Sequence, residues 1–250
     1  MADFDLTSEQ RAVRRAVREF AEREILPFVE EHEAAERYPA TLIEKLIPLG
    51  YLTPIIPERY GGSETDVVTY GVICEELARV DWVVASVVSV TNSLVAGSIV
   101  RFGTDTQKEK WLPGICDGSV LTSACLTEPG GGSDLAGIQT RAVKTEGGWR
   151  LDGSKVFISH AAHAGVLLVA ATIDPAQRHR GVTVFLVDPT VAGVEIAEVP
   201  MRTLKRDNLA VIHFDGVEVE DTAVATFCYD NKAIGSLEIT TAARPDDFEA

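Results

Sequence analysis

The stretch that decides the fold runs from Ala124 to Asp134 and reads Ala-Cys-Leu-Thr-Glu-Pro-Gly-Gly-Gly-Ser-Asp. It overlaps a run at Leu121–Thr127 that is apolar and β-branched enough for a buried strand, and Pro129 ends that run. The three glycines that follow allow backbone dihedrals that other residues resist, so several N–H groups can turn toward one phosphate. Ser133 adds a hydroxyl donor. An ordinary glycine-rich turn explains the triple glycine equally well, so this stretch alone leaves its function open.

A helical region precedes this stretch. Thr7–Gln10 has the spacing of a capping box, in which the first and fourth residues each bond the backbone N–H of the other. The same spacing recurs at Thr41–Glu44 and at Thr104–Gln107. Two more helices are expected near residues 66–80 and 82–102. Residues 1–119 are therefore predicted to form an all-α domain.

The apolar period changes after Val120. Short apolar or alternating runs bounded by Gly, Pro, Asp and Asn are typical of strands, and they predict strands at 121–127, 139–144, 149–152, 155–159, 166–173, 182–187, 194–199, 210–214 and 217–219. This spacing favours an antiparallel β-sandwich or barrel over residues 120–228, so the fold class is α+β with two domains. Residues 229–250 are expected to form a C-terminal tail.

Charge and cysteine usage exclude several classes of function. The chain has 23 Lys and Arg against 38 Asp and Glu, a formal net charge of -15, whereas nucleic-acid binding needs a basic face. The four cysteines have no metal or redox spacing and the N-terminus has no signal peptide, so a cytoplasmic protein with reduced cysteines is expected. His160 and His163 have no cysteine or carboxylate cluster beside them, so no metal site is expected.

One apolar segment has the length of a membrane span. Trp82–Val100 contains no charged residue, but six of its residues are polar: Ser86, Ser89, Thr91, Asn92, Ser93 and Ser98. These groups would be poorly placed in hydrocarbon, so a helix buried inside a helical domain is the better interpretation. No membrane partner is expected.

A second motif follows the first and reads Gly153-Ser154-Lys155-Val156-Phe157-Ile158-Ser159-His160. Together with Thr127–Asp134 it resembles the flavin-binding middle domain of the acyl-CoA dehydrogenases. Upstream segments follow the pattern of the same family in order: Ile56–Gly62, Glu75–Asp81, Asn92–Leu94, Arg101–Thr104 and Gln107–Pro113. The resemblance covers residues 3–225.

The resemblance implies that flavin adenine dinucleotide (FAD) lies across the β domain. Carried over by position, Leu126 and Thr127 would face the isoalloxazine edge, Gly132 and Ser133 the pyrophosphate and the acyl-thioester arm, and Phe157 and Ser159 the other edge of the flavin. The chemistry of the cofactor agrees with these positions, because a flat ring packs on an apolar or aromatic wall and a diphosphate binds glycine N–H groups. An ordinary core aromatic at Phe157 and a strand hydroxyl satisfied by the backbone at Ser159 remain alternatives.

The implied reaction is α,β-desaturation of an acyl-CoA or acyl-carrier-protein thioester, in which a carboxylate removes the α-proton while the β-hydrogen leaves as hydride. We assign no catalytic residue, because Glu75, Glu76 and Glu128 are all expected to be structural. Family members continue into a C-terminal four-helix domain that supplies the catalytic glutamate, and nothing after Thr226 resembles it.

Two hypotheses follow. In the first, the chain is part of a dehydrogenase whose C-terminal helices come from a longer protein or from a partner chain in a homo- or hetero-oligomer. The alternative is a shortened regulatory subunit that binds flavin or an acyl group and desaturates nothing.

Three departures from the family pattern stand out. His160 replaces an asparagine, and Phe157 replaces a tryptophan or tyrosine. Arg202–Leu209 replaces a turn that normally carries a glycine and hydroxyls, which puts the substrate-side loop in question.

Overall fold

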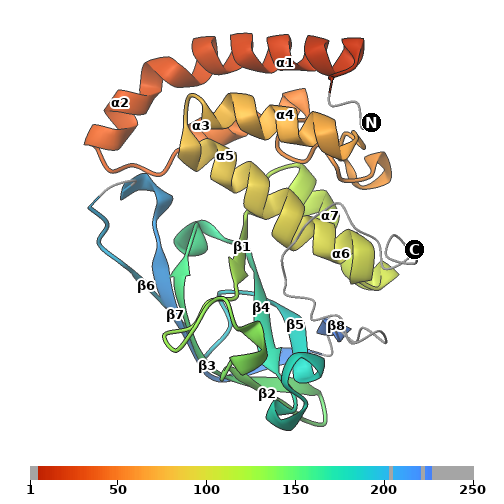
Figure 1. The fold of residues 1–250 in the computed structure, drawn as a ribbon. Coiled ribbons are helices and arrows are strands. Elements are labelled where there is room, and N and C mark those ends of the chain that lie inside the picture. The colour runs from red at the N-terminus through yellow and green to blue at the C-terminus, as the bar shows by residue number, and fades with distance from the viewer. Residues whose placement is uncertain (1–4, 203–204, 221–222, 227–250) are drawn as a thin grey trace.

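A layer of helices lies over a curled β-sheet in the computed structural model, which describes residues 5–202, 205–220 and 223–226 (Figure 1). The helices are α1 (Ser8–Phe20), α2 (Leu26–Ala34), α3 (Ala40–Glu44), α4 (Val67–Ala78), α5 (Trp82–Ser89), α6 (Gly97–Phe102) and α7 (Asp105–Cys116), with π-helical turns at Ala21–Ile25 and Val90–Ala96. The predicted order of a helical domain followed by a β domain is confirmed. The predicted boundary at residue 119 falls between α7 and the first strand, and the predicted tail at 229–250 lies outside the described residues.

Two of the three predicted capping boxes are confirmed. Thr7 caps α1 and Thr104 caps α7, each through a side chain that accepts the N–H of a glutamine three residues later. The prediction at Thr41 is wrong. The N-cap of α3 is Pro39, two residues before Thr41, so Thr41 already lies within the helix and its side chain caps nothing.

A continuous helix from Trp82 to Phe102 joins the two halves of the molecule. Side chains of α5 pack with α1, α3 and α4 in the helical core, whereas Val95, Ala96 and Ile99 pack against the sheet. This helix is long and apolar enough to cross a bilayer, but 61% of its most apolar window is buried inside the protein. Figure 1 shows it between α4 and the strands β4 and β5, so its apolar surface has partners within the chain on both sides.

The β domain is an eight-stranded sheet with the strand order β6-β7-β3-β2-β4-β5-β8, and β1 also pairs with β4. Its strands are β1 (Thr122–Cys125), β2 (Arg141–Lys144), β3 (Gly148–Ile158), β4 (Val166–Thr172), β5 (Val182–Val187), β6 (Val194–Glu198), β7 (Ala210–Glu220) and β8 (Ala223–Thr226). The expectation of purely antiparallel pairing needs one correction, because β1 and β2 both run parallel to β4. The four short runs predicted at 149–152, 155–159, 210–214 and 217–219 are two long strands, β3 and β7.

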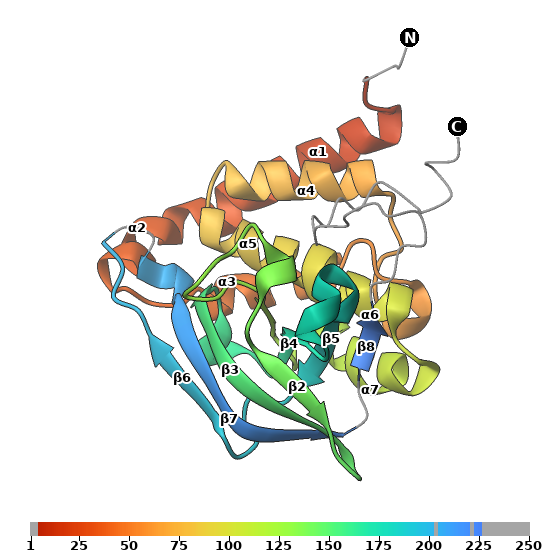
Figure 2. The same ribbon diagram turned by 60° about the horizontal axis from the view of Figure 1, so that its bottom comes forward.

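Both faces of β4 are buried, which explains its uninterrupted apolar sequence. Val166, Leu168 and Ala170 face the central helix. The alternate residues Leu167 and Val169 face a second core that is enclosed by the curl of the sheet. Figure 2 shows how β6, β7, β3 and β2 curve away from β4 and β5 around this second core.

Candidate functional site

The glycine-rich loop leaves the sheet at a split. One edge of β4 pairs first with β1, through Thr122 to Cys125, and then with β2, through Arg141. The chain between these two strands must therefore depart from the edge of β4 and return to it a few residues farther along. This geometry places residues 126–140, including the triple glycine, at the end of β1 beside β3.

A buried ion pair anchors the start of this loop. Lys155 of β3 is fully buried, and its Nζ donates to the Glu128 carboxylate at 2.8 Å and to the Leu126 carbonyl at 3.1 Å. Glu128 also accepts the backbone N–H groups of Gln139 at 2.6 Å and Thr140 at 2.9 Å. Burial alone would raise the pKa of Glu128, but these hydrogen bonds outweigh it and hold the pKa below its ordinary value. Glu128 therefore clamps the start of the loop to β3 and to residues 139–140.

The three glycines leave the backbone of the loop uncovered, because they have no side chains. None of Gly130, Gly131 and Gly132 has a φ in the left-handed region, so the expectation that they supply unusual dihedrals is wrong. A Cβ at Gly131 would meet nothing within 4 Å, and one at Gly132 would lie 3.3 Å from Thr127 Cγ2. The loop is exposed, and within the described residues the N–H groups of Gly132 and Ser133 have no hydrogen-bond partner. Open backbone donors beside a hydroxyl suit an anionic ligand.

Phe157 is displayed to solvent by a β-bulge. Between Lys155 and Ile158, β3 carries one more residue than the facing segment of β7, from Ile212 to Ala210. Phe157 has a left-handed φ of 58°, which is costly for a residue with a side chain. The residue is 65% exposed, so it is not the ordinary core aromatic that the sequence allowed. The neighbouring Val156 N–H donates to the Thr127 carbonyl at 2.9 Å, so the ring stands beside the start of the glycine loop. Backbone strain of this kind is a feature of functional sites.

We predict that Phe157→Gly raises the free energy of unfolding by about 1 kcal/mol, because glycine relieves the left-handed strain and little buried surface is lost. Phe157→Ala is the matched control. Alanine also removes the ring but keeps a Cβ, so we expect no gain. Urea unfolding followed by circular dichroism measures both variants, and a Gly variant no more stable than the Ala variant would contradict the assignment of strain.

Ser159 lies at the end of β3 in a buried polar cluster. Its hydroxyl donates to Asp207 Oδ2 at 2.9 Å, and its carbonyl accepts from the Ser123 hydroxyl at 2.6 Å. His160 follows with a left-handed φ of 64°, and its Nε2 lies 3.1 Å from Ser86 Oγ. Burial, with a smaller contribution from His163, lowers the pKa of His160 to about 4, so the ring is neutral at pH 7. The hydroxyl of Ser159 is satisfied by a side chain and not by the backbone.

The loop at 202–209, which differs from the family pattern, is held to the helical layer by ion pairs of its described residues. Arg206 is buried, and its guanidinium donates to Asp81 Oδ2 at 2.9 Å and to Glu33 Oε2 at 2.7 Å. Asp81 in turn accepts the Val83 N–H at the start of α5. Lys205 pairs with Glu36, which lies just after α2. These ion pairs place Asp207 against Ser159, a contact that links two segments far apart in the sequence.

The other two candidate carboxylates lie elsewhere. Glu76 on α4 is buried and pairs with Arg18 at 2.7 Å and with Arg79 at 3.2 Å. The hydrogen bond from Arg18 lowers the pKa of Glu76, against the opposing effect of burial. Glu75 pairs with Arg14 of α1 at 2.5 Å. Both glutamates hold α1 to α4, which agrees with the expected packing role.

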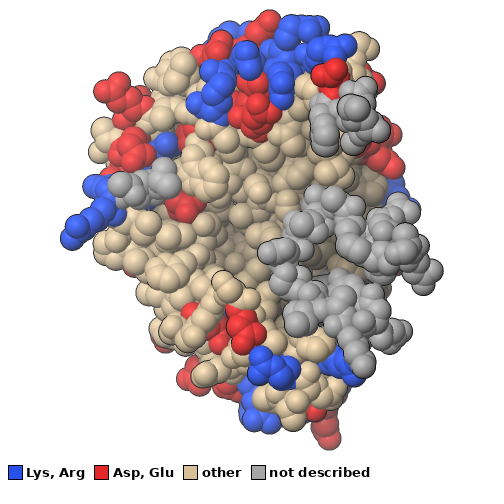
Figure 3. Space-filling view, viewed as in Figure 1, with Lys and Arg blue, Asp and Glu red and all other residues tan. Residues whose placement is uncertain are grey.

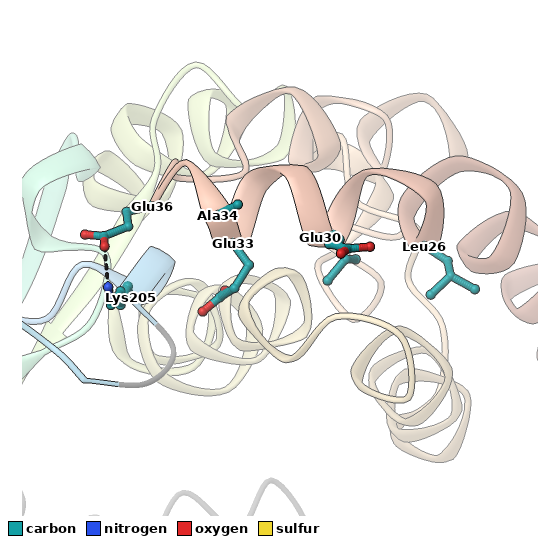
Figure 4. A pocket seen from close by; sticks show the side chains of 7 residues that line it. Leu26, Glu30, Glu33, Ala34, Glu36 and Lys205 are labelled. Atoms are coloured by element: carbon teal, nitrogen blue, oxygen red, sulfur yellow. Dashed lines mark hydrogen bonds and ion pairs between the residues drawn. The ribbon is translucent and has the colours of Figure 1, made fainter.

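A pocket of about 660 Å³ opens over α2 (Figure 4). Leu26, Val29 and Ala34 form its apolar part, and Glu30, Glu33, Glu36 and Lys205 complete its lining. Three carboxylates against one lysine that is already paired would repel a nucleotide diphosphate. We therefore do not place the cofactor in this pocket.

The face shown in Figure 3 is hollowed between the helical layer and the sheet, and the hollow is free of the Lys, Arg, Asp and Glu that surround it. The core shared by the helical layer and the sheet has half-buried hydrophobic residues packed against it, including Val90, Leu94 and Leu126. Within the residues that the structure describes, no group of three or more His, Cys, Asp or Glu is placed to hold a metal ion. This surface suits an uncharged group better than a metal or a polyanion.

The structure brings most of the expected site residues together. Leu126 and Thr127 follow the end of β1, with Gly132 against Thr127, and Phe157 lies beside them on β3. Ser159 comes directly after β3 and is bonded to Ser123 of β1. Ser133 lies farther along the loop, and it is exposed and hydrogen-bonds none of the other site residues. Sequence reasoning missed Lys155 and Asp207. A lysine inside an apolar strand pattern was a usable signal for Lys155, whereas nothing local marks Asp207.

Two family models match the chain: "Acyl-CoA dehydrogenase, N-terminal domain" over residues 7–119 and "Acyl-CoA dehydrogenase, middle domain" over residues 123–217. An acyl-CoA dehydrogenase of Bacillus subtilis (strain 168) is 34% identical over 217 residues, which cover 86% of this chain and 57% of that protein.

Two solved structures are similar. Butyryl-CoA dehydrogenase from Megasphaera elsdenii has 33% identity and a TM-score of 0.83, and the match covers 90% of this chain and 61% of that one. A glutaryl-CoA dehydrogenase from Mycobacterium smegmatis, in complex with FADH2, has 32% identity and a TM-score of 0.81, covering 89% and 56%. The chain therefore spans little more than half the length of these relatives.

Proposed function

This chain belongs to the acyl-CoA dehydrogenase family, and we propose that it binds FAD and an acyl thioester as part of an enzyme for α,β-desaturation. The observation that carries the proposal is the juxtaposition, at the split in the sheet, of an open glycine loop and an exposed aromatic ring on a strained bulge. The residues fit the cofactor, because they offer free backbone donors for a diphosphate and a flat apolar wall for a ring system.

In this proposal the roles follow the position of each residue. Gly132 and Ser133 bind the pyrophosphate through their free N–H groups, and the Ser133 hydroxyl donates to the pyrophosphate and lies within reach of the thioester arm. Leu126, Thr127 and Phe157 orient the isoalloxazine ring, and Ser159 meets its edge. Bound FAD supplies the acceptor for the hydride that leaves the substrate. The uncharged hollow excludes water from the acyl chain.

The base that removes the α-proton is proposed to lie outside the residues described. A general base needs a pKa near the working pH, whereas the cations beside Glu76 and Glu128 lower the pKa of each carboxyl. We propose that another segment or a partner chain supplies this carboxylate, which implies an oligomer or a longer protein. We also propose that the protein is cytoplasmic and that its partners are neither nucleic acid nor membrane.

The experiment that tests the proposal is a thermal melt of the chain with and without FAD. At a free cofactor concentration of a hundred times the dissociation constant, binding stabilises the fold by about 2.7 kcal/mol, which for 250 residues is a melting shift of roughly 5 to 11 °C. We expect Ser133→Ala to reduce the affinity for FAD and Gly132→Val to reduce it more, because a valine there crowds Thr127 and the open amides.

Gly147→Val is the matched control, because a Cβ at this exposed turn glycine meets nothing within 4 Å and the position lies between β2 and β3, away from the loop. It should keep the full FAD shift. A melt that millimolar FAD leaves unchanged, together with a colourless purified protein, would count against a flavin site in this chain.

A further inference from the structure

The hydroxyl of Ser159 donates its one hydrogen bond to a single partner. Ser159 Oγ donates to Asp207 Oδ2 at 2.9 Å. Both ends of this bond are fixed, since the Ser159 carbonyl accepts from Ser123 Oγ at 2.6 Å and the Asp207 carbonyl accepts the His160 N–H at 3.3 Å. The side chains therefore meet in one geometry.

Nothing around Asp207 competes for this bond in the part of the chain that the structure describes. The second oxygen, Oδ1, is buried without a hydrogen-bond partner and lies 3.6 Å from His160 Nε2. That nitrogen already pairs with Ser86 Oγ at 3.1 Å. The adjacent Arg206 directs its guanidinium to Asp81 and Glu33. Burial raises the pKa of Asp207, and the hydrogen bond from Ser159 opposes that rise.

An ionised carboxylate can only accept hydrogen bonds, and a serine hydroxyl has a single proton to donate. While its O–H donates to Asp207, Ser159 has only its lone pairs to offer to a ligand. It can therefore accept a hydrogen bond from the ligand but cannot donate one.

We propose that Asp207 is a positioning residue that makes Ser159 a hydrogen-bond acceptor toward the flavin. The proposal rests on the proposed function. The flavin edge that Ser159 meets is proposed to be the one that carries N5. Reduced flavin has an N–H there, whereas oxidised flavin has a bare nitrogen that can only accept. The Ser159–Asp207 pair therefore favours binding of the reduced cofactor over the oxidised one.

The charge of Asp207 acts in the opposite direction when the reduced flavin is an anion, because like charges repel. Replacing Asp207 alone would change both effects at once. A double-mutant cycle with Ser159 separates them, since the charge effect persists without the hydroxyl and the positioning effect does not.

The experiment measures the dissociation constants of FAD and of anaerobically reduced FADH2 for four chains: wild type, Asp207→Asn, Ser159→Ala and the double variant. The asparagine amide can donate to Ser159 Oγ, which releases the serine proton toward the ligand. The compared quantity is the ratio of the dissociation constant of FAD to that of FADH2. We expect Asp207→Asn to lower this ratio, which means tighter relative binding of oxidised flavin. The decrease should be about tenfold larger with Ser159 than with Ala at that position, the size of one reversed hydrogen bond.

Ser159→Thr, which keeps the hydroxyl, should keep the coupling. If Asp207→Asn melts below the assay temperature, Asp207→Ala in the same cycle gives a smaller coupling of the same sign. An equal change of the ratio with and without the Ser159 hydroxyl would overturn the role of Asp207 and leave the flavin site intact. Failure of the wild type to bind either form would contradict the proposed function and the role of Asp207 together.

Discussion

Butyryl-, octanoyl- or palmitoyl-CoA, added anaerobically to this chain in saturating FAD, should leave the flavin absorption band unbleached. The three glutamates weighed above as candidate bases are all paired with cations: Glu128 with Lys155, Glu76 with Arg18, and Glu75 with Arg14. Losing a positioned general base typically costs 10²- to 10⁴-fold in rate, and an incomplete pocket adds a loss of orientation.

Two controls make this result interpretable. Dithionite should bleach the same sample, which shows that the flavin can be reduced. Supplying a C-terminal helical domain with a glutamate, in the same chain or from a partner, should restore bleaching by the thioester. If the chain alone bleaches, the base is within it, and Glu75→Gln, Glu76→Gln and Glu128→Gln would identify which carboxylate acts.

Lys155→Met should lower the free energy of unfolding by about 3 to 5 kcal/mol, the usual cost of removing one partner from a buried ion pair. The ammonium is fully buried, and it joins the Glu128 carboxylate and the Leu126 carbonyl. Without it, Glu128 keeps a buried charge that only two backbone N–H groups offset. The loop it anchors should also bind FAD more weakly.

The double variant Lys155→Met with Glu128→Gln should recover part of this loss, because no unpaired charge is then buried. Arg178→Met is the matched control: its partner Asp134 lies in the same loop at 3.3 Å, but both side chains are exposed. We expect a change of less than about 1 kcal/mol there. Urea unfolding at pH 7 measures all three, and a Lys155→Met loss no larger than the control would refute the clamp.

Local patterns were sufficient for much of the fold. The capping spacing at Thr7 and Thr104 located two helix starts, because both partners of a capping box lie within one turn. The alternation and turn residues after Val120 located seven of the eight strands. Parallel pairing of β1 and β2 with β4 was not predictable in this way, since it joins residues more than thirty apart in the sequence.

The sequence by itself determined the family, the order of the two domains, and the glycine loop with its flanking residues Thr127, Phe157 and Ser159, because these features depend on short-range order along the chain. Only the tertiary structure decided how they work together. It showed that the glycines leave space and do not supply unusual dihedrals, that a bulge turns Phe157 outward, and that Asp207 accepts a hydrogen bond from the Ser159 hydroxyl. Each of these depends on strand register or on a contact between distant segments, and a side chain carries no local signal of the partner that folding brings to it.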